Sequence, residues 1–264
     1  MLRDITIGRY IEADSPLHRA DARSKIIATL IYSISVFVLH EPLTIGILTL
    51  FTAAAVFISN VPIRAMLKGL KPLRWFILFT VVMSIFTSDG STLWQWQIFR
   101  ITDNGIKTAV MLSLKFLLLV SGTSLMTLTT PPIALTDGLA RLMKPLKLIK
   151  LPVDDIAMMI SITLRFIPIF AGEAEKISKA QRARGASFKE KGFGKIKAIL
   201  PMTVPLFISV LRKSEELALA MDARCYGKRS RRPRKKTRFH RTDILILSIT
   251  ALVCVFLSLF EICH

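Results

Sequence analysis

The chain has 264 residues, a mean hydropathy of +0.50 and a formal net charge of +19. An ordinary soluble domain is rarely both this apolar and this basic, and a disordered chain is not this apolar. The cysteines, Cys225, Cys254 and Cys263, lack metal-ligand spacing and are too few for a secreted disulfide scaffold. We therefore expect segregation, with apolar runs in a lipid bilayer and basic segments on its cytoplasmic side.

Five apolar segments predict transmembrane helices. They lie at residues 26–39, 43–58, 75–87, 106–128 and 244–260. Several are shorter than the roughly 20 apolar residues that a span usually needs, so polar residues must finish those helices at the headgroups. The predicted fold class is an all-α integral membrane protein with about five transmembrane helices and a cytoplasmic domain of amphipathic helices.

The basic residues predict the orientation of the spans. The N-terminal segment holds five lysines and arginines, the loop between the first two spans holds none, and residues 129–243 hold 25 of the chain's 37. Because these residues concentrate on the cytoplasmic side, the N-terminus is predicted to lie inside and the C-terminus outside.

One lysine lies near the middle of a predicted span. Lys115 falls within residues 106–128, and an intramembrane lysine marks a functional site unless it snorkels or pairs within the bundle. Both interpretations stay open. No carboxylate lies in the middle of a predicted span, which disfavours a proton relay or an ion carrier.

The segment between the fourth and fifth spans reads as helices rather than as a polar loop. A short amphipathic helix is expected at residues 134–148, and two long helices are expected at 153–184 and 195–224. Each long helix would measure roughly 45 Å, with bends at its internal prolines.

These two long helices resemble each other when they are aligned at one constant offset. Glu175, Ala180, Ala183 and Arg184 match Glu215, Ala220, Ala223 and Arg224. The prolines do not match, so plain amphipathic packing remains an alternative. An arginine in a last turn complements the helix dipole, which is its simplest role. Two such ends, slim with alanine, instead favour docking in two related grooves of a partner, where each guanidinium offers five fixed donors. A cytoplasmic two-subunit partner of a membrane protein suggests a transport ATPase.

Three stretches resemble the transmembrane coupling subunit, or T-component, of energy-coupling factor (ECF) transporters for vitamins and metal ions. They are Asp14-Ser15-Pro16-Leu17-His18-Arg19 with residues 21–25, Leu164-Arg165-Phe166-Ile167-Pro168 with residues 180–185, and Ala220-Met221-Asp222-Ala223-Arg224-Cys225-Tyr226-Gly227. The resemblance covers essentially the whole chain. It implies a multi-pass protein of the bacterial cell membrane that works with two ABC-type ATPase subunits and a substrate-binding membrane S-component.

The resemblance also implies the site residues. Those that dock in the ATPase subunits are Ala183, Arg184 and Gly185 at the first helix end and Ala223, Arg224 and Cys225 at the second. ATP and Mg²⁺ would be bound by the partners, so no catalytic residue, cofactor or metal is expected in this chain. The sequence contains no P-loop pattern of the G-x-x-x-x-G-K-S/T type.

Cys225 stands where the family usually has glycine. If this residue were left-handed, its side chain would cost roughly 1–2 kcal/mol. The sequence leaves open whether Cys225 or Gly227 caps the second helix.

A basic run at residues 228–241 holds nine lysines and arginines and no acid. Because it immediately precedes the last span, anionic lipids are simpler partners for it than nucleic acid. The chain is thus divided into residues 1–130 with four spans, 131–227 with the coupling helices, and 228–264 with the basic linker and the last span.

Two other functions compete with this interpretation. A conventional ABC importer permease would typically present one coupling helix per subunit and line its own substrate path. An integral membrane enzyme would need clustered acids or histidines near a membrane face, whereas His18, His40, His240 and His264 are scattered. The predicted function is therefore a non-catalytic coupling (scaffold) subunit that links ATP hydrolysis to the uptake of vitamins or metal ions.

Overall fold

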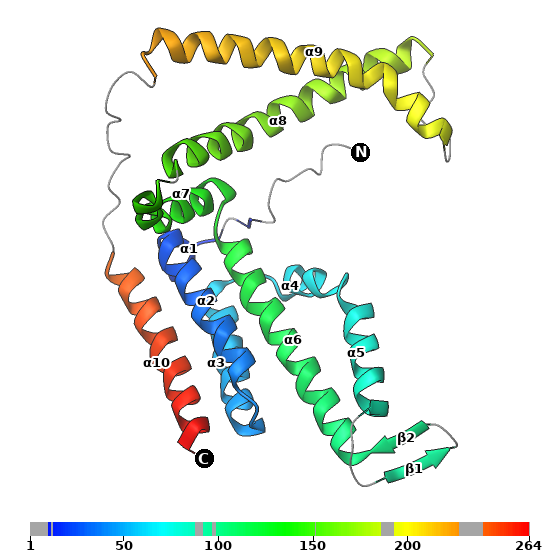
Figure 1. Cartoon of the computed structure of the whole chain (residues 1–264), viewed down its shortest axis with the longest axis vertical. Helices are drawn as coiled ribbons and strands as arrows, with labels where there is room; N and C mark the ends of the chain where they lie inside the picture. The colour runs from blue at the N-terminus through cyan, green and yellow to red at the C-terminus, as the bar shows by residue number, and fades with distance from the viewer. Residues whose placement is uncertain are drawn as a thin grey trace. The chain divides into compact units, whose positions relative to one another are not determined.

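Helices form at each of the apolar segments of the sequence (Figure 1). The computed structural model describes residues 10–11, 13–87, 92–96, 99–150, 152–185, 193–226 and 240–263. The chain divides into two compact units. The bundle unit comprises residues 8–154 and 239–264, and the long-helix unit comprises residues 1–7 and 155–238.

A helix of the bundle unit lies on each of the five predicted spans. They are α2 (Ala22–Val38), α3 (Pro42–Ser59), α5 (Arg74–Thr87), α6 (Asp103–Thr129) and α10 (Arg241–Cys263). By length and composition α3, α6 and α10 are apolar enough to cross a bilayer, and α5 is a shorter apolar helix. The predicted all-α integral membrane fold is confirmed, and the helix ends differ from the predicted ones by at most four residues.

Local chemistry sets the ends of these helices. The Asp21 carboxylate caps α2 by accepting a hydrogen bond from Arg23 N at 3.1 Å. Pro42 begins α3, where its missing N–H has no partner to lose. Asn60 ends α3 in the left-handed conformation at φ 53°, which asparagine tolerates better than most residues.

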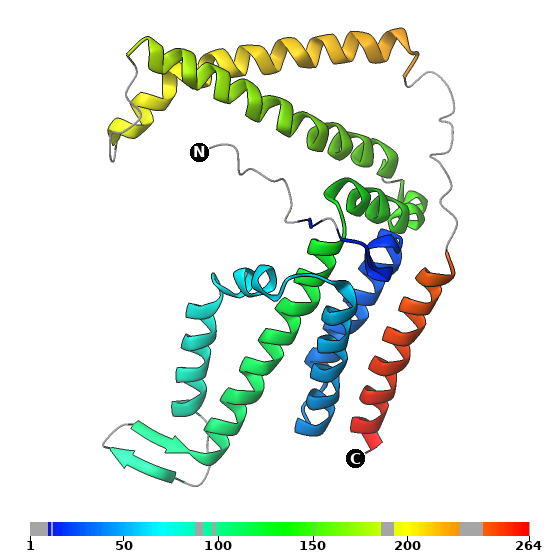
Figure 2. The same cartoon turned by 180° about the vertical axis from the view of Figure 1, so that it is seen from behind.

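The helices of the bundle meet in two groups of end residues. At one end, here the Lys25 end, the Lys25 ammonium donates to Thr129 O of α6 at 2.9 Å. At the opposite end, here the His40 end, His40 N–H donates to the Glu261 carboxylate of α10. Hence α10 runs parallel to α2, while α6 runs antiparallel to both (Figures 1 and 2). The chain that connects α6 to α10 therefore starts and finishes at the Lys25 end.

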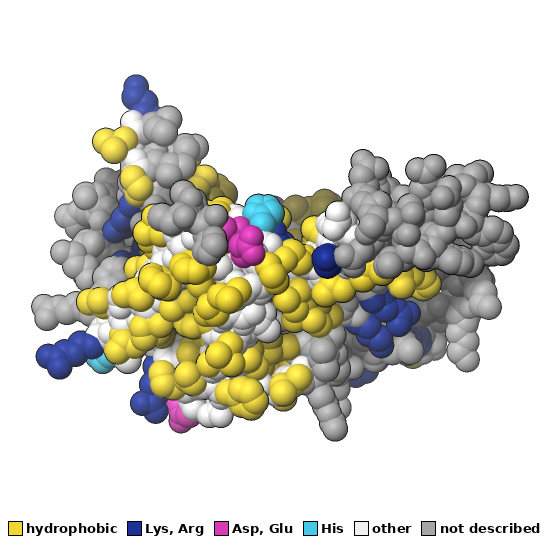
Figure 3. All heavy atoms as spheres, turned by 90° about the horizontal axis from the view of Figure 1, so that it is seen from below, with side chains coloured by type: hydrophobic (Ala, Val, Ile, Leu, Met, Phe, Trp, Pro, Cys, Tyr) yellow, Lys and Arg dark blue, Asp and Glu magenta, His cyan; other side chains and the backbone are white. Residues whose placement is uncertain are grey.

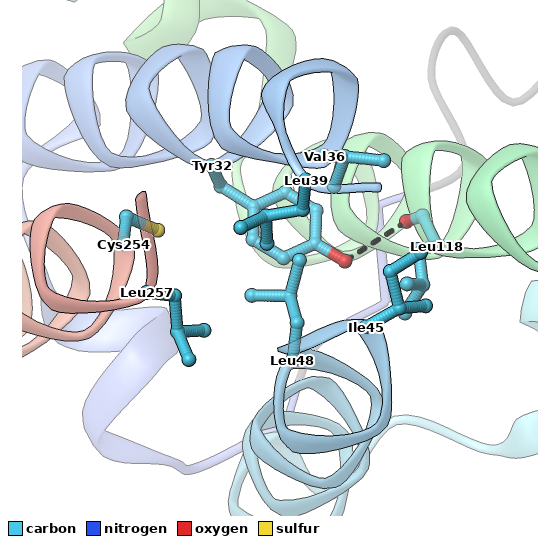
Figure 4. Packing of buried hydrophobic residues seen from close by; sticks show 8 residues of the cluster. All are labelled: Tyr32, Val36, Leu39, Ile45, Leu48, Leu118, Cys254 and Leu257. Atoms are coloured by element: carbon cyan, nitrogen blue, oxygen red, sulfur yellow. Dashed lines mark hydrogen bonds between the residues drawn. The ribbon is translucent and has the colours of Figure 1, made fainter. Parts of the chain in front are cut away.

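The core of the bundle is packed by side chains from four helices (Figure 4). They are Tyr32, Val36 and Leu39 next to Ile45, Leu48, Leu118, Cys254 and Leu257. The Tyr32 hydroxyl donates to Leu118 O at 3.2 Å and lies 2.9 Å from Thr52 Oγ1. A Cβ at Gly122 would lie 2.5 Å from the Tyr32 ring, so glycine lets α6 approach α2. Between helices in lipid, such close packing and buried hydrogen bonds supply the stability that water-driven burial cannot.

Shorter elements join these helices. They are α1 (Pro16–Arg19), α4 (Ile63–Leu70), β1 (Thr92–Trp96), β2 (Phe99–Thr102), α7 (Pro132–Leu142) and the 3₁₀ helix η1 (Lys144–Ile149). The antiparallel hairpin of β1 and β2 was not predicted, and it is the exception to the helical fold among the described residues. Two strands of four and five residues give too short a pattern to be recognised beside long apolar helices.

The helix α7 packs on α2 within the bundle unit. A Cβ at Gly138 would lie 2.9 Å from Ala22 Cβ and 3.2 Å from Arg23 N, so glycine allows this close crossing. Residues 131–154 therefore group with the bundle by packing. The predicted domain boundary at residue 130 was instead placed where the chain was expected to leave the membrane on its cytoplasmic side.

The long-helix unit is built from two helices of equal length, α8 (Val153–Ala183) and α9 (Phe193–Ala223), each of 31 residues. The offset between their first residues equals the offset between their last residues, as in the predicted repeat. Prolines stand inside both helices, Pro168 in α8 and Pro201 and Pro205 in α9. Figure 1 shows α9 changing direction in its yellow first half, which holds its two prolines.

A proline creates the polar contact between α8 and α9. Pro205 has no N–H, so it cannot bond the Pro201 carbonyl one turn before it. Gln181 Nε2 of α8 donates to this freed Pro201 O at 3.2 Å. Further along, Lys213 Nζ of α9 lies 6.0 Å from the centre of the Phe170 ring of α8. Because the contact moves backward along α9 as it moves forward along α8, the helices cross antiparallel.

Large apolar side chains also cover the outside of the bundle helices. Exposed examples are Phe37, Leu50, Phe57, Trp75, Phe79, Leu252 and Phe256. Figure 3 shows hydrophobic side chains over most of the coloured surface on the face seen from below. A soluble protein rarely exposes such contiguous apolar surface, whereas lipid-facing helices require it.

Candidate functional site

The end of α8 carries the first predicted docking motif. Gly185 follows the last turn with φ +90°, a conformation that favours glycine. Its N–H donates to Arg182 O at 3.0 Å, and Arg184 N–H donates to Ala180 O at 3.2 Å. Arg184 is therefore the last residue before a left-handed cap, with its side chain exposed.

The end of α9 repeats this geometry with a different residue. Cys225 is left-handed at φ 55°, and its N–H donates to Asp222 O at 2.8 Å. Tyr226 N–H donates to Met221 O at 3.0 Å. This pair of bonds is the Schellman motif, with Cys225 at the position that glycine usually takes. The alternative of a cap at Gly227 is wrong, because the helix has already turned at Cys225.

All six predicted site residues are exposed at these two helix ends. Among the residues that the structure describes, neither the Arg184 nor the Arg224 guanidinium forms an ion pair. A last-turn arginine of this kind is well placed to complement the dipole of its own helix and to bind an external acceptor. In both motifs a left-handed residue directly follows the arginine.

The structure does not bring the two motifs together. Gln181 pairs with Pro201 near the end of α8, so Arg184 lies beside the first half of α9. Arg224 lies well beyond Lys213 along α9, at the opposite end of the crossed pair (Figure 1). At about 1.5 Å per residue the two tips are roughly 40 Å apart. The two motifs are therefore two separate surfaces and not one shared site.

The two left-handed caps predict opposite effects of two substitutions. Cys225→Gly should stabilise the end of α9 by about 1 kcal/mol, because glycine is left-handed without a Cβ penalty. Gly185→Ala should loosen the end of α8 by a similar amount, through the backbone alone, since a Cβ there meets nothing within 4 Å. Amide hydrogen exchange over the last turn of α9 should become about fivefold slower in Cys225→Gly. Exchange over the last turn of α8 should become about fivefold faster in Gly185→Ala.

A matched control exists inside α8. Gly172 also has open space around it and no left-handed backbone, so Gly172→Ala should slow exchange. If Gly185→Ala and Gly172→Ala change exchange in the same direction, the left-handed cap does not persist in the protein.

The N-terminal Ser15-Pro16-Leu17-His18 motif forms a local network that sequence reasoning did not explain. His18 Nε2 lies 3.1 Å from Ile11 O and His18 Nδ1 lies 2.7 Å from Ser15 Oγ. Burial lowers the pKa of His18 below its usual value, so the ring is neutral near neutral pH. Because a carbonyl only accepts, Nε2–H donates to Ile11 O, and Nδ1 accepts from Ser15 O–H. The Ser15 oxygen in turn accepts from His18 N–H at 3.3 Å and caps α1.

Next to this network, at the Lys25 end of the bundle, buried polar groups form a cluster of hydrogen bonds between helices. The buried Lys25 ammonium donates to Thr129 O and Thr130 Oγ1, at 2.9 and 3.2 Å. The buried Asp243 carboxylate accepts from Asp21 N–H at 2.7 Å and from His240 N–H at 2.7 Å. This polar cluster, made of Lys25, Asp21, Asp243, Thr129 and Thr130, therefore connects the first residues of α2 and α10 with the last residues of α6. In the sequence, these residues can be recognised only as charges next to apolar segments.

Lys115 was the intramembrane charge left open by the sequence. The Glu261 carboxylate of α10 acts on it electrostatically. Glu261 also accepts from Thr44 Oγ1 at 3.2 Å and lies 3.5 Å from His40 Nδ1. Among the described residues no ion pair joins Lys115 to Glu261, so both interpretations of Lys115 stay open.

A metal-ligand arrangement is not formed by the described residues. No group of three or more histidine, cysteine or acidic side chains able to hold a metal ion occurs among them. Of the cysteines that the structure describes as free thiols, Cys225 is exposed and Cys254 is buried. The two exposed helix ends with their arginines are therefore the candidate site.

These features define an all-α integral membrane protein with a pair of long helices that end in matching exposed arginine motifs. The chain belongs to the family described as "Cobalt transport protein" (CbiQ), whose sequence model matches residues 13–236.

Relatives of known description match almost the whole chain. It is 45% identical over 263 residues to the energy-coupling factor transporter transmembrane protein EcfT of Ruminiclostridium cellulolyticum, covering 99% of this chain and 98% of the relative. The protein of the same description from Streptococcus thermophilus is 39% identical over 259 residues, with 97% of both chains covered. The one from Bacillus subtilis is 42% identical over 232 residues, with 86% of both covered. The resemblance drawn from the sequence motifs is confirmed.

Proposed function

We propose that this chain is the membrane-embedded coupling subunit of an ECF-type ABC importer for vitamins or metal ions. It has no catalytic residue, cofactor or metal of its own. Two ABC-type ATPase subunits bind ATP and Mg²⁺ and dock at Arg184 and Arg224. The observation that carries the proposal is the shared cap geometry of these two exposed arginines at opposite ends of one helix pair.

The second partner is a substrate-binding membrane S-component. Exposed apolar side chains on α9 recur at helical spacing, at Leu200, Val204, Phe207, Ile208 and Leu211. Such a stripe supports contact with an apolar partner or with lipid rather than with water. Movement of the docked ATPase subunits would then reach the S-component through α8 and α9.

In the proposed orientation the Lys25 end of the bundle is cytoplasmic. The chain leaves and re-enters the bundle at that end, so residues 131–239 cross the bilayer an even number of times. By length and composition α8 is apolar enough to cross, yet α9 is not among the candidate spans of the described residues. This supports α8 and α9 as coupling helices on the cytoplasmic side, with the N-terminus inside and the C-terminus outside.

Basic residues fit the same orientation. The run at residues 228–241 would face anionic headgroups of the cytoplasmic leaflet, worth roughly 1 kcal/mol per basic residue near the surface. A role in nucleic-acid binding is not proposed. A conventional permease with one coupling helix and a membrane enzyme remain the competing functions, and neither accounts for two equivalent arginine caps.

Native cysteines test both the orientation and the docking. In a Cys263→Ser variant, Cys225 is the exposed thiol at the α9 tip, while Cys254 is buried. An impermeant maleimide should fail to label Cys225 in intact cells and should label it in inside-out vesicles. In vesicles that hold the whole transporter, the ATPase subunits should slow this labelling at least tenfold.

The reciprocal variant, Cys225→Ser, is the matched control. It leaves Cys263 next to the predicted outer C-terminus, and labelling should then occur in intact cells. Labelling of Cys225 from outside would refute the orientation. Equal labelling with and without bound ATPase subunits would refute docking at the α9 tip.

A further inference from the structure

A half-open apolar groove lies in the bundle unit at its Lys25 end. Its volume is about 360 Å³, and α2, α3, α6 and α10 line it, with the start of α1 at its mouth. Ala28 and Tyr32 of α2 form its floor and are buried. Ile58 of α3 and Ile249 of α10 line its sides and are exposed. The groove therefore opens sideways between α3 and α10, toward the hydrocarbon of a bilayer.

Several polar groups of this lining are hydrogen-bonded within the protein. Thr52 Oγ1 donates to Leu48 O at 2.8 Å, and Thr250 Oγ1 donates to Ile246 O at 2.8 Å. The Lys25 ammonium is bonded to the end of α6. What the groove mainly offers to an occupant is therefore hydrocarbon contact.

The length of the groove suits an acyl chain of one leaflet. Its floor extends from Lys25 to Tyr32, which is about 10 Å along α2. One leaflet of a bilayer holds roughly 15 Å of hydrocarbon, so the groove follows most of its depth. A slender acyl chain therefore fits lengthwise along this floor.

Positive charge stands at the mouth of the groove. Arg241 begins α10 and is exposed, and Leu245, one turn further on the same face, lines the groove. The basic run at residues 228–241 ends at this same residue. A phosphate at the headgroup level is thus complemented at the point where an acyl chain would enter.

We propose that the groove binds one anionic phospholipid, with an acyl chain along the floor of α2 and its phosphate at Arg241. The lipid would fill the space between α3 and α10 and become part of the bundle. This binding does not depend on docking of the ATPase subunits, which the labelling of Cys225 reports separately.

The test uses the full chain purified from membranes of phosphatidylcholine with a minor fraction of phosphatidylglycerol. Native mass spectrometry counts the lipids that remain bound. The wild-type chain should retain one phosphatidylglycerol in preference to phosphatidylcholine. Ala55→Phe places a ring in the groove and should lower the retained fraction at least tenfold. Ala53→Phe, on the exposed face of the same helix and outside the lining, should leave it unchanged.

A third variant separates the headgroup from the tail. Arg241→Gln should abolish the preference for phosphatidylglycerol while one phospholipid still binds. The proposal is overturned if the wild-type chain retains no lipid, or if Ala55→Phe retains as much as Ala53→Phe. It is also overturned if Ala55→Phe keeps the lipid but loses a membrane partner, because a protein then occupies the groove.

Discussion

Replacing Arg184 and Arg224 together by alanine should release the ATPase subunits from the membrane and abolish uptake. Each guanidinium would be desolvated on docking, and truncating one partner of a buried, hydrogen-bonded charge pair typically costs about 2–5 kcal/mol. Each single change should therefore weaken ATPase binding by at least about 30-fold, and the double change should leave none detectable. Co-purification of the ATPase subunits and substrate uptake measure the effect.

Controls distinguish docking from general damage. Lys179→Ala and Arg212→Ala remove exposed cations from the same two helices and should leave binding nearly intact. Arg184→Lys with Arg224→Lys keeps the charge but loses the planar fork, so it should restore binding only in part. Normal binding and uptake by the double alanine variant would reduce both arginines to helix caps.

The spans were predictable because a bilayer requires apolar residues along each spanning segment, and a short stretch of sequence is enough to show them. Each membrane helix must be apolar over most of its length, and residues such as Pro42 and Asp21 mark where it begins. The repeat was predictable for a related reason. Alanines and arginines that match at one constant offset require matching helix ends, and α8 and α9 begin and end at that same offset.

Contacts between distant residues were not predictable in this way. Nothing near Lys25 in the sequence indicates that its partners are Thr129 and Thr130, which lie far along the chain in and just after α6. The contact of Gln181 with Pro201 depends on a carbonyl that Pro205 frees, and on the crossing of two helices. Such pairings follow from the packing of whole helices, which a single sequence does not specify.

Cys225 shows where a local rule gave an incomplete answer. Glycine is favoured at a left-handed cap, so Gly227 was a reasonable alternative. The structure keeps the cap directly after Arg224, and it accepts the strain of a side chain at φ 55°. The position of the arginine relative to the helix end is therefore maintained in α9 as in α8. This is expected if a docking partner recognises the position of the arginine and not the type of residue that forms the cap.

Lys25→Met should destabilise the bundle by about 2–3 kcal/mol, the scale of lost hydrogen bonds to a charged group. The change leaves Thr129 O and Thr130 Oγ1 without their donor in a buried site. Reversible unfolding in mixed micelles gives the free energy of unfolding. Lys179→Met, at an exposed site on α8, should change that free energy by less than about 1 kcal/mol.

A double-mutant cycle identifies the contact itself. Thr130→Val alone removes one acceptor of the Lys25 ammonium and should cost about 1 kcal/mol. After Lys25→Met the same change should cost much less, with a coupling free energy of at least about 0.5 kcal/mol, because the partner is already gone. Additive effects would contradict the contact. This polar cluster joins the last residues of α6 to the first residues of α2 and α10. Its loss should therefore also loosen this end of the bundle, from which the chain continues into α7.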